Sequence, residues 1–126
     1  MSEPTPSPEA PLLVATAWPR PDVCLVRLTG ELDMSGTPLV RDRLAEQTAA
    51  RPAYLVLDLT AVKLIAAAGI SLLITAMRNE HGIHGRLHVV GRAEGAVLRT
   101  LRLTGVDALL RIHDSVDAAL TATDAP

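Results

Sequence analysis

The stretch LIAAAGISLL, residues 64–73, decides the fold, because a strand is expected to end there and a helix to begin. From Ile70 onward, apolar residues recur at i, i+3, i+4 and i+7, which predicts an amphipathic helix of about three turns. Such junctions usually carry Ser, Thr, Asp or Asn, whose side-chain oxygen accepts hydrogen bonds from the free N–H groups of the helix. Here the junction is Ala66–Ala68 followed by Gly69, so the sequence places no side-chain oxygen there.

Strand-like and helix-like segments alternate on both sides of this junction. The runs 12–18 and 23–30 are rich in β-branched residues, and the PRPD turn between them predicts a hairpin. The continuous apolar run 54–59 is typical of a central strand that is covered on both faces. Further strands are expected at 86–91 and 108–113, and further helices at 36–50, 93–105 and 114–122. This order predicts an α/β fold in which a mixed sheet of about five strands packs with about four helices.

Local signals indicate where three of these helices begin or end. Thr37 is expected to be an N-cap with Pro38 at the first helical position, and Gly105 is expected to end the helix before it. Asp114, with Asp117 three residues later, predicts the start of the last helix.

Composition predicts one domain. The chain has 126 residues, of which 48% are hydrophobic, and Trp18 and Tyr54 are its only aromatic residues, so the core must be aliphatic. The proline-rich segment 1–11 is expected to be a disordered tail, residues 12–122 the domain, and residues 123–126 a frayed end. Cys24 is the single cysteine and lies in an apolar run, which predicts a buried, inert thiol.

Charge and hydropathy argue against two kinds of partner. The net charge is about −2, with both signs mixed along the chain, so no basic footprint for nucleic acid is present. No apolar run approaches the ~20 residues of a membrane span, so direct insertion into a membrane is not expected. The first residues lack the basic start and apolar core of a signal peptide, and a cytoplasmic protein is therefore expected.

Four segments together resemble a known family. They are LTGELD at 28–33, LVLDLTAV at 55–62, the junction at Gly69, and VGRAEGAVLRTLRLTGVDALLRIHDSVDAAL at 90–120. Over residues 12–122 the chain resembles STAS domains of the anti-sigma factor antagonist type.

The resemblance implies a binding module and not an enzyme. Members of this family bind an anti-sigma factor, often a serine kinase of the ATPase fold, and so release a sigma factor. The kinase phosphorylates a Ser or Thr in an Asp-Ser-Ser/Thr-Gly junction, the phosphorylated antagonist dissociates, and a phosphatase restores it. Aligned on Gly69, Ala66 and Ala67 stand at the first two positions, and Ala68 stands at the phosphoacceptor position. Alanine has no hydroxyl, so the usual switch cannot operate there.

The resemblance also indicates which residues meet a partner and which support them. The expected partner-binding residues are Glu31, Asp33, Ser35, Ala67, Ala68, Ile70 and Ser71, with GELD (30–33) forming a loop after the second strand. Asp58 is expected to support the junction by accepting backbone N–H bonds, and Thr60 to end its strand in a turn. Thr60 and Ser71 also remain open as alternative phosphorylation sites. For GELD, an ordinary solvated turn remains open.

Two further motifs favour ordinary structural roles. His81, His84 and His88, with Glu80, are spaced poorly for a shared zinc ion, so they are interpreted as solvent-facing loop residues and no metal is expected. The segment GRAEG (91–95) lacks the spacing and the Lys-Ser/Thr of a P-loop and predicts a strand-to-helix turn, which leaves weak nucleotide binding open. No catalytic constellation is visible, and no cofactor is expected.

Several accounts of the alanines remain open. The chain is a permanently unphosphorylated antagonist, a divergent scaffold, a form in which the alanines were introduced to hold one state, or a domain whose switch was lost by drift. The alternative function is therefore a non-catalytic scaffold or accessory subunit of a signalling complex or a membrane transporter. The oligomeric state, including a homo-oligomer, also stays open.

Overall fold

Five strands in the order β1-β2-β3-β4-β5 form one sheet in the computed structural model, which describes residues 12–79 and 86–124. β1 (Leu13–Arg20) pairs antiparallel with β2 (Val23–Leu32), so the predicted hairpin is confirmed. β3 (Tyr54–Ile65), β4 (Leu87–Val90) and β5 (Arg111–His113) extend the sheet in parallel. The sheet is therefore mixed, as predicted, and its four parallel strands end at one common edge.

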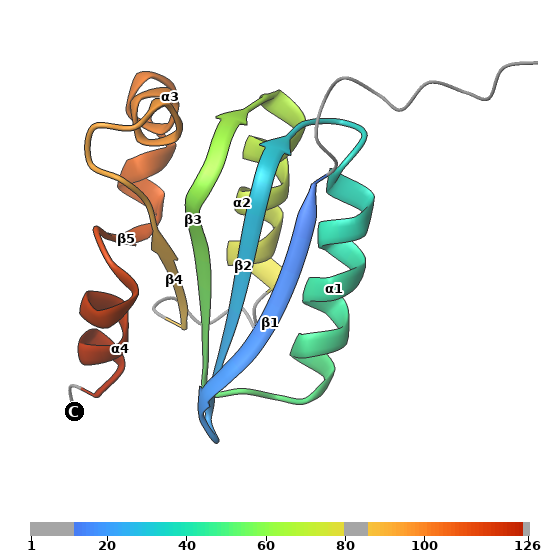
Figure 1. Ribbon diagram of the computed structural model, residues 1–126, viewed down its shortest axis with the longest axis vertical. Coiled ribbons are helices and arrows are strands. Elements are labelled where there is room, and N and C mark those ends of the chain that lie inside the picture. The colour runs from blue at the N-terminus through green and yellow to red at the C-terminus, as the bar shows by residue number, and fades with distance from the viewer. Residues whose placement is uncertain (1–11, 80–85, 125–126) are drawn as a thin grey trace, which may run out of the picture.

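Helices cover both faces of this sheet (Figure 1). α1 (Thr37–Ala49) and α2 (Ala67–Asn79) pack on one face, α4 (Val116–Asp124) packs on the other, and α3 (Ala96–Thr104) lies near the end of β3. Alternate residues of β2 point to the two sides: Val26 belongs to the large cluster shared with α1, α2 and α3, and Leu25 to the small cluster shared with α4. Cys24 is buried as expected, and its thiol lies 3.5 Å from Gln47 Oε1.

β3 is twice as long as its apolar run predicted, because it continues from Tyr54 to Ile65. Its second half pairs with the end of β2, with Leu32 in register with Ile65. Two expectations are therefore wrong: Thr60 lies inside β3 and does not end it, and residues 30–32 of GELD belong to β2 and not to a loop. The cause is cross-strand pairing, which the local sequence does not show.

Two predicted helix starts are wrong by one residue. The N-cap of α1 is Gly36, and the Thr37 hydroxyl donates to the Met34 carbonyl 3.3 Å away instead of accepting from the helix. α4 begins at Val116, and its capping oxygen is the Ser115 hydroxyl, which accepts from the N–H of Ala118 at 3.0 Å. Ser115, not Asp114, therefore caps α4.

The segment from Gly105 to the end of α4 agrees with expectation at its start and differs from it in two later places. Gly105 ends α3 in the left-handed conformation with φ of 77°, as predicted. The segment 108–113 is not one strand: the 3-10 helix η1 (Val106–Leu109) precedes the three-residue β5. α4 reaches Asp124, and Thr123 is buried, with its hydroxyl accepting from Arg20 Nη1 at 2.8 Å, so the fold extends beyond residue 122. The expected tail, 1–11, and residues 125–126 of the expected frayed end lie outside the described residues.

Candidate functional site

Backbone hydrogen bonds start α2 at the alanine junction. β3 ends at Ile65, Ala66 makes the connection, and α2 begins at Ala67. The Ala66 carbonyl accepts from the N–H groups of Gly69 (2.9 Å) and Ile70 (3.0 Å), which starts the helix. Ala66 occupies the N-cap position and has no side-chain oxygen, so it cannot cap the first turn of α2 in the way that serine or aspartate would.

Gly69 lets α2 approach the end of β2 closely. A Cβ atom at this position would lie 2.8 Å from both Ile65 Cγ1 and Leu32 Cγ, and 2.9 Å from the Leu32 carbonyl oxygen. Real side chains do not make such short contacts, and here the Leu32 backbone is one of the obstacles. The glycine is therefore required by packing at the place where the junction meets β2.

An aspartate turn precedes α1 on the same edge of the sheet. Asp33 Oδ1 accepts from the Ser35 hydroxyl (2.7 Å), the Ser35 N–H (3.0 Å) and the Gly36 N–H (3.2 Å). The Ser35 hydroxyl has the largest effect and lowers the pKa of Asp33; desolvation raises it, and the N–H groups of Gly36 and Ser35 lower it further, so the net shift is downward. Asp33 is thus an ionised carboxylate, and it holds the turn that leads into α1.

The structure brings the aspartate turn and the alanine junction together. The N–H of Ala66 donates to the Leu32 carbonyl at 2.9 Å. On the N-terminal side of this bond, Glu31 of β2 is in register with Leu64 of β3. Asp33 follows Leu32 directly, so the acidic turn and the alanine junction leave neighbouring strands at the same edge. We call this set the edge surface; it consists of Glu31, Asp33, Met34, Ser35, Leu64, Ala66, Ala67, Ala68, Ile70 and Ser71.

Two apolar members of the edge surface were not predicted. Met34 is 78% exposed in the aspartate turn, and Leu64 is 48% exposed opposite Glu31. An apolar residue inside the otherwise polar turn 33–36 was the signal for Met34, whereas the exposure of Leu64 depends on the length of β3. On the helix side, Ala67 and Ser71 are exposed, and Ala68 and Ile70 are half-buried. The edge surface therefore combines small, apolar and acidic groups.

Asp58 and Thr60 lie away from the edge surface. Asp58 Oδ1 accepts from the N–H (2.9 Å) and the hydroxyl (2.7 Å) of Thr60, and Asp58 Oδ2 accepts from Arg27 Nε at 2.8 Å. These bonds stand where the register of β2 and β3 shifts, seven residues before β3 ends. Burial would raise the pKa of Asp58, but the bonds from Thr60 and Arg27 outweigh it and lower that pKa. Both residues support a strand irregularity and not the junction, which corrects the expected loop-supporting role.

Of the predicted histidine group, the structure describes only His88. His81, His84 and Glu80 lie outside the described residues, and His88 is buried against His113 instead of facing solvent. Among residues 12–79 and 86–124, no three His, Cys, Asp or Glu side chains are placed to hold a metal ion. GRAEG forms the turn between β4 and α3, as predicted, with Gly95 as the N-cap.

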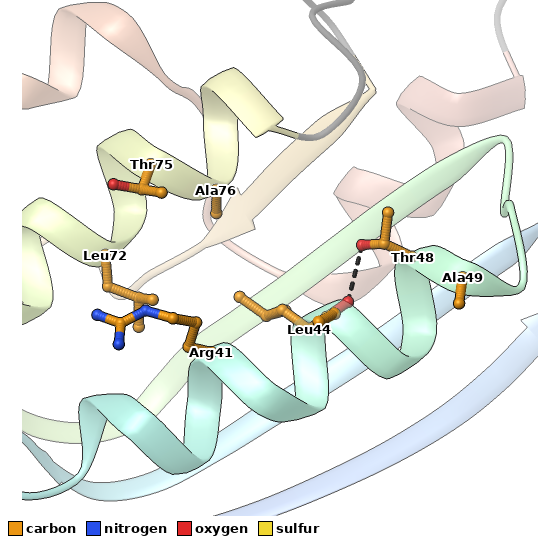
Figure 2. Close-up of a pocket in the computed structure, with 8 residues that line it drawn as sticks. Arg41, Leu44, Thr48, Ala49, Leu72, Thr75 and Ala76 are labelled. Atoms are coloured by element: carbon orange, nitrogen blue, oxygen red, sulfur yellow. Dashed lines mark hydrogen bonds between the residues drawn. The ribbon is translucent and has the colours of Figure 1, made fainter.

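A shallow groove separates α1 from α2 on the face next to the edge surface (Figure 2). Its volume is about 360 Å³, and its walls are mostly apolar, with Leu44 and Ala76 facing one another across it. Arg41 lies at one end, and the Thr48 hydroxyl turns back to the Leu44 carbonyl at 2.7 Å. The groove holds no group of side chains with an evident catalytic role.

The family follows from a comparison with known domains. Residues 17–119 match the STAS domain model. The chain belongs to the STAS domain family. This STAS domain is 28% identical over 99 residues, 79% of its own length and 80% of the relative's, to the anti-sigma-F factor antagonist RsfB of Mycobacterium tuberculosis.

Solved structures agree with this assignment. An anti-sigma factor antagonist from Mycobacterium paratuberculosis superposes with a TM-score of 0.82 and 28% identity, over 94% of this STAS domain and 98% of that chain. The unphosphorylated anti-sigma factor antagonist SpoIIAA shares the fold, with a TM-score of 0.69 and 15% identity over 90% and 99% of the two chains. The predicted family and fold class are therefore confirmed. No helix in the described part of this STAS domain is long and apolar enough to cross a membrane.

Proposed function

We propose that this STAS domain is an anti-sigma factor antagonist, which binds an anti-sigma factor through the edge surface and so releases a sigma factor. The observation that carries the proposal is its likeness, over nearly the whole chain, to a solved anti-sigma factor antagonist, with a TM-score of 0.82 and 28% identity. The function is that of a binding module, not an enzyme, and the partner is expected to be a serine kinase of the ATPase fold.

The composition of the edge surface suits a protein partner. Ala67 and Ala68 present only methyl groups, which allow the backbone of a partner to come close. Met34 and Leu64 add exposed apolar area, and Glu31 and Asp33 add negative charge beside it. A partner that meets this surface with an apolar centre and basic groups around it would match it in both respects.

The junction also supports a binding state that phosphorylation at Ala68 cannot end. A phosphoserine there would stand at the start of α2 and add nearly two negative charges to a surface that is already acidic. Alanine cannot be phosphorylated, so we propose that this antagonist stays in its binding state. Ala68→Ser should then restore a phosphoacceptor, detected as a gain of about 80 Da in the presence of the kinase and ATP.

The decisive experiment measures binding to the anti-sigma factors of the source organism by calorimetry. The full chain should bind one of them, and Ala68→Glu, which adds charge without a phosphate, should weaken binding at least tenfold. Ala50→Glu is the matched control, because Ala50 is exposed at the C-terminal end of α1, away from the edge surface. This variant should bind like the parent chain.

Two results would contradict the proposal. Equal affinity of Ala68→Glu and the parent chain would remove the junction from the interface. Binding to no anti-sigma factor, combined with co-purification of a scaffold or transporter complex, would favour the accessory-subunit function instead.

A further inference from the structure

His88 and His113 form a hydrogen-bonded pair between β4 and β5. His88 Nδ1 lies 2.8 Å from His113 Nε2, and the two rings stack with centroids 5.0 Å apart and an angle of 27° between their planes. His88 is only 1% exposed, and His113 is half-buried. Neither ring belongs to the edge surface, and the proposed function does not use them.

The short contact constrains the protons of the pair. A neutral imidazole has one N–H donor and one acceptor nitrogen, so one of the two facing nitrogens carries the hydrogen and the other offers its lone pair. A proton added to that acceptor would turn N–H···N into two opposed N–H groups. It would also place a cation against a ring that is shielded from water. A first proton on the outer nitrogen of the donor ring keeps the N–H···N bond, whereas a second proton, on the facing acceptor, breaks it.

The surroundings give the extra proton little support. The Tyr54 ring of β3 meets His88 edge-on at 5.8 Å, and Arg111 is in register with His88 on the same side of the sheet. Burial first, and then the positive charge of Arg111, lower the pKa of His113, and the carboxylate of Asp114 offsets this only in part. Two other charged groups lie near this face: Asp58, which is bonded to Arg27, and Arg102, which lines a cavity of about 400 Å³ together with His113. The α4 side is apolar apart from the exposed Asp117, with Val116, Ala119 and Leu120.

We propose that the His88–His113 pair is an acid-sensitive latch that holds β5 and α4 to the sheet and releases them when it is protonated. β5 has only three residues and is in register with β4 at only three positions, and its Ile112 packs against the large cluster. α4 is also held by Ala119 in the small cluster and by Arg20, which donates to the Leu120 carbonyl and the Thr123 hydroxyl. The Gly91 N–H, which donates to the His113 carbonyl at 3.0 Å, adds one more bond at the end of β5. Loss of the ring–ring bond therefore weakens the attachment of β5 at its last residue, just before α4.

The direction of the pH effect follows from proton binding. In the open form both imidazoles are free to take protons near their ordinary pKa of about 6.5, whereas the closed pair keeps its bond with at most one added proton. The open population should therefore grow as the pH falls below about 6.5, roughly tenfold per pH unit for each additional proton bound. Above that pH the latch stays closed.

Hydrogen exchange on the full chain at pH 7.5 and pH 5.5, corrected for intrinsic exchange rates, tests the latch without any partner. Peptides covering 111–124 should lose protection about tenfold at pH 5.5, whereas peptides covering α1 should not. His113→Gln, which cannot titrate, should abolish this acid effect. His81→Gln combined with His84→Gln is the matched control, because it removes two other histidines and should leave the effect in place.

Unchanged protection of 111–124 between the two pH values would overturn the proposal, as would an acid effect that survives in His113→Gln. If that variant does not fold, a ¹⁵N NMR titration of the histidine rings in the parent chain decides. The latch requires the two rings to titrate as a coupled pair below pH 6.5. Independent titration of both rings at ordinary values would contradict it.

Discussion

Ala66 donates its N–H to the carbonyl oxygen of Leu32 at 2.9 Å, and this bond joins the start of α2 to the end of β2. The aspartate turn begins at the next residue, Asp33, so one backbone bond couples both halves of the edge surface. A partner that binds there meets a single rigid unit, and less conformational entropy is lost on binding than if two independent loops had to be ordered.

A serine at the N-cap of α2 should stabilise the fold. Ala66→Ser supplies the missing oxygen to the first-turn N–H groups and should raise the free energy of unfolding by about 1 kcal/mol. Urea unfolding measures the change, with Ala50→Ser as a control beyond the last turn of α1. An unchanged midpoint would mean that the new hydroxyl does not reach these N–H groups.

A methyl group at Gly69 should destabilise the junction. Its Cβ would lie 2.8 Å from Ile65 and Leu32 side-chain atoms, and such overpacking costs typically 1–3 kcal/mol. Alanine recovers about 1 kcal/mol of helix propensity, so we expect Gly69→Ala to lose about 1 kcal/mol in urea unfolding. Ser71→Ala, at an exposed position of the same helix, is the control and should not lose stability. A midpoint that does not fall in Gly69→Ala would show that the close approach at Gly69 relaxes easily.

Two substitutions at Asp33 should separate its structural role from its charge. Asp33→Ala removes the acceptor of three hydrogen bonds and should lower the midpoint of unfolding, whereas Asp33→Asn keeps an acceptor oxygen and should stay close to the parent chain. If the carboxylate also contacts the partner, Asp33→Asn should still weaken binding in calorimetry. Binding at parental affinity by the folded Asn variant would limit Asp33 to holding the turn.

Asp58 should contribute stability that is lost in acid. Its pKa in the folded state is lowered below its ordinary value of 3.8, so its contribution is fully present above about pH 4 and is lost as the pH falls further. Asp58→Asn should lose about 1–3 kcal/mol at pH 7 and show a smaller further loss below pH 4 than the parent chain. Urea unfolding from pH 7 to pH 2.5 checks this, with the exposed Asp42→Asn as control. A parallel pH profile in parent and variant would contradict it.

Residue patterns within single segments were enough to predict the elements and their order. The hairpin, the central apolar strand and the helix that contains Ile70 and Met77 each follow from the spacing of neighbouring residues, and Gly105 ends α3 because few other residues adopt its φ. The absence of a hydroxyl at residues 66–68 is likewise visible in the sequence alone. These properties depend on residues a few positions apart, which is why they can be read locally.

Only the tertiary structure decided which distant residues meet. Arg27 and Asp58 are 31 positions apart and hold the irregularity of β3, and His88 and His113 are 25 apart and bury a ring that had been expected in solvent. The same holds for Leu32 and Ala66, whose bond assembles the edge surface. Periodicity shows which face of an element is buried, but the neighbours across the sheet are set by strand register, which is fixed only when the whole core packs.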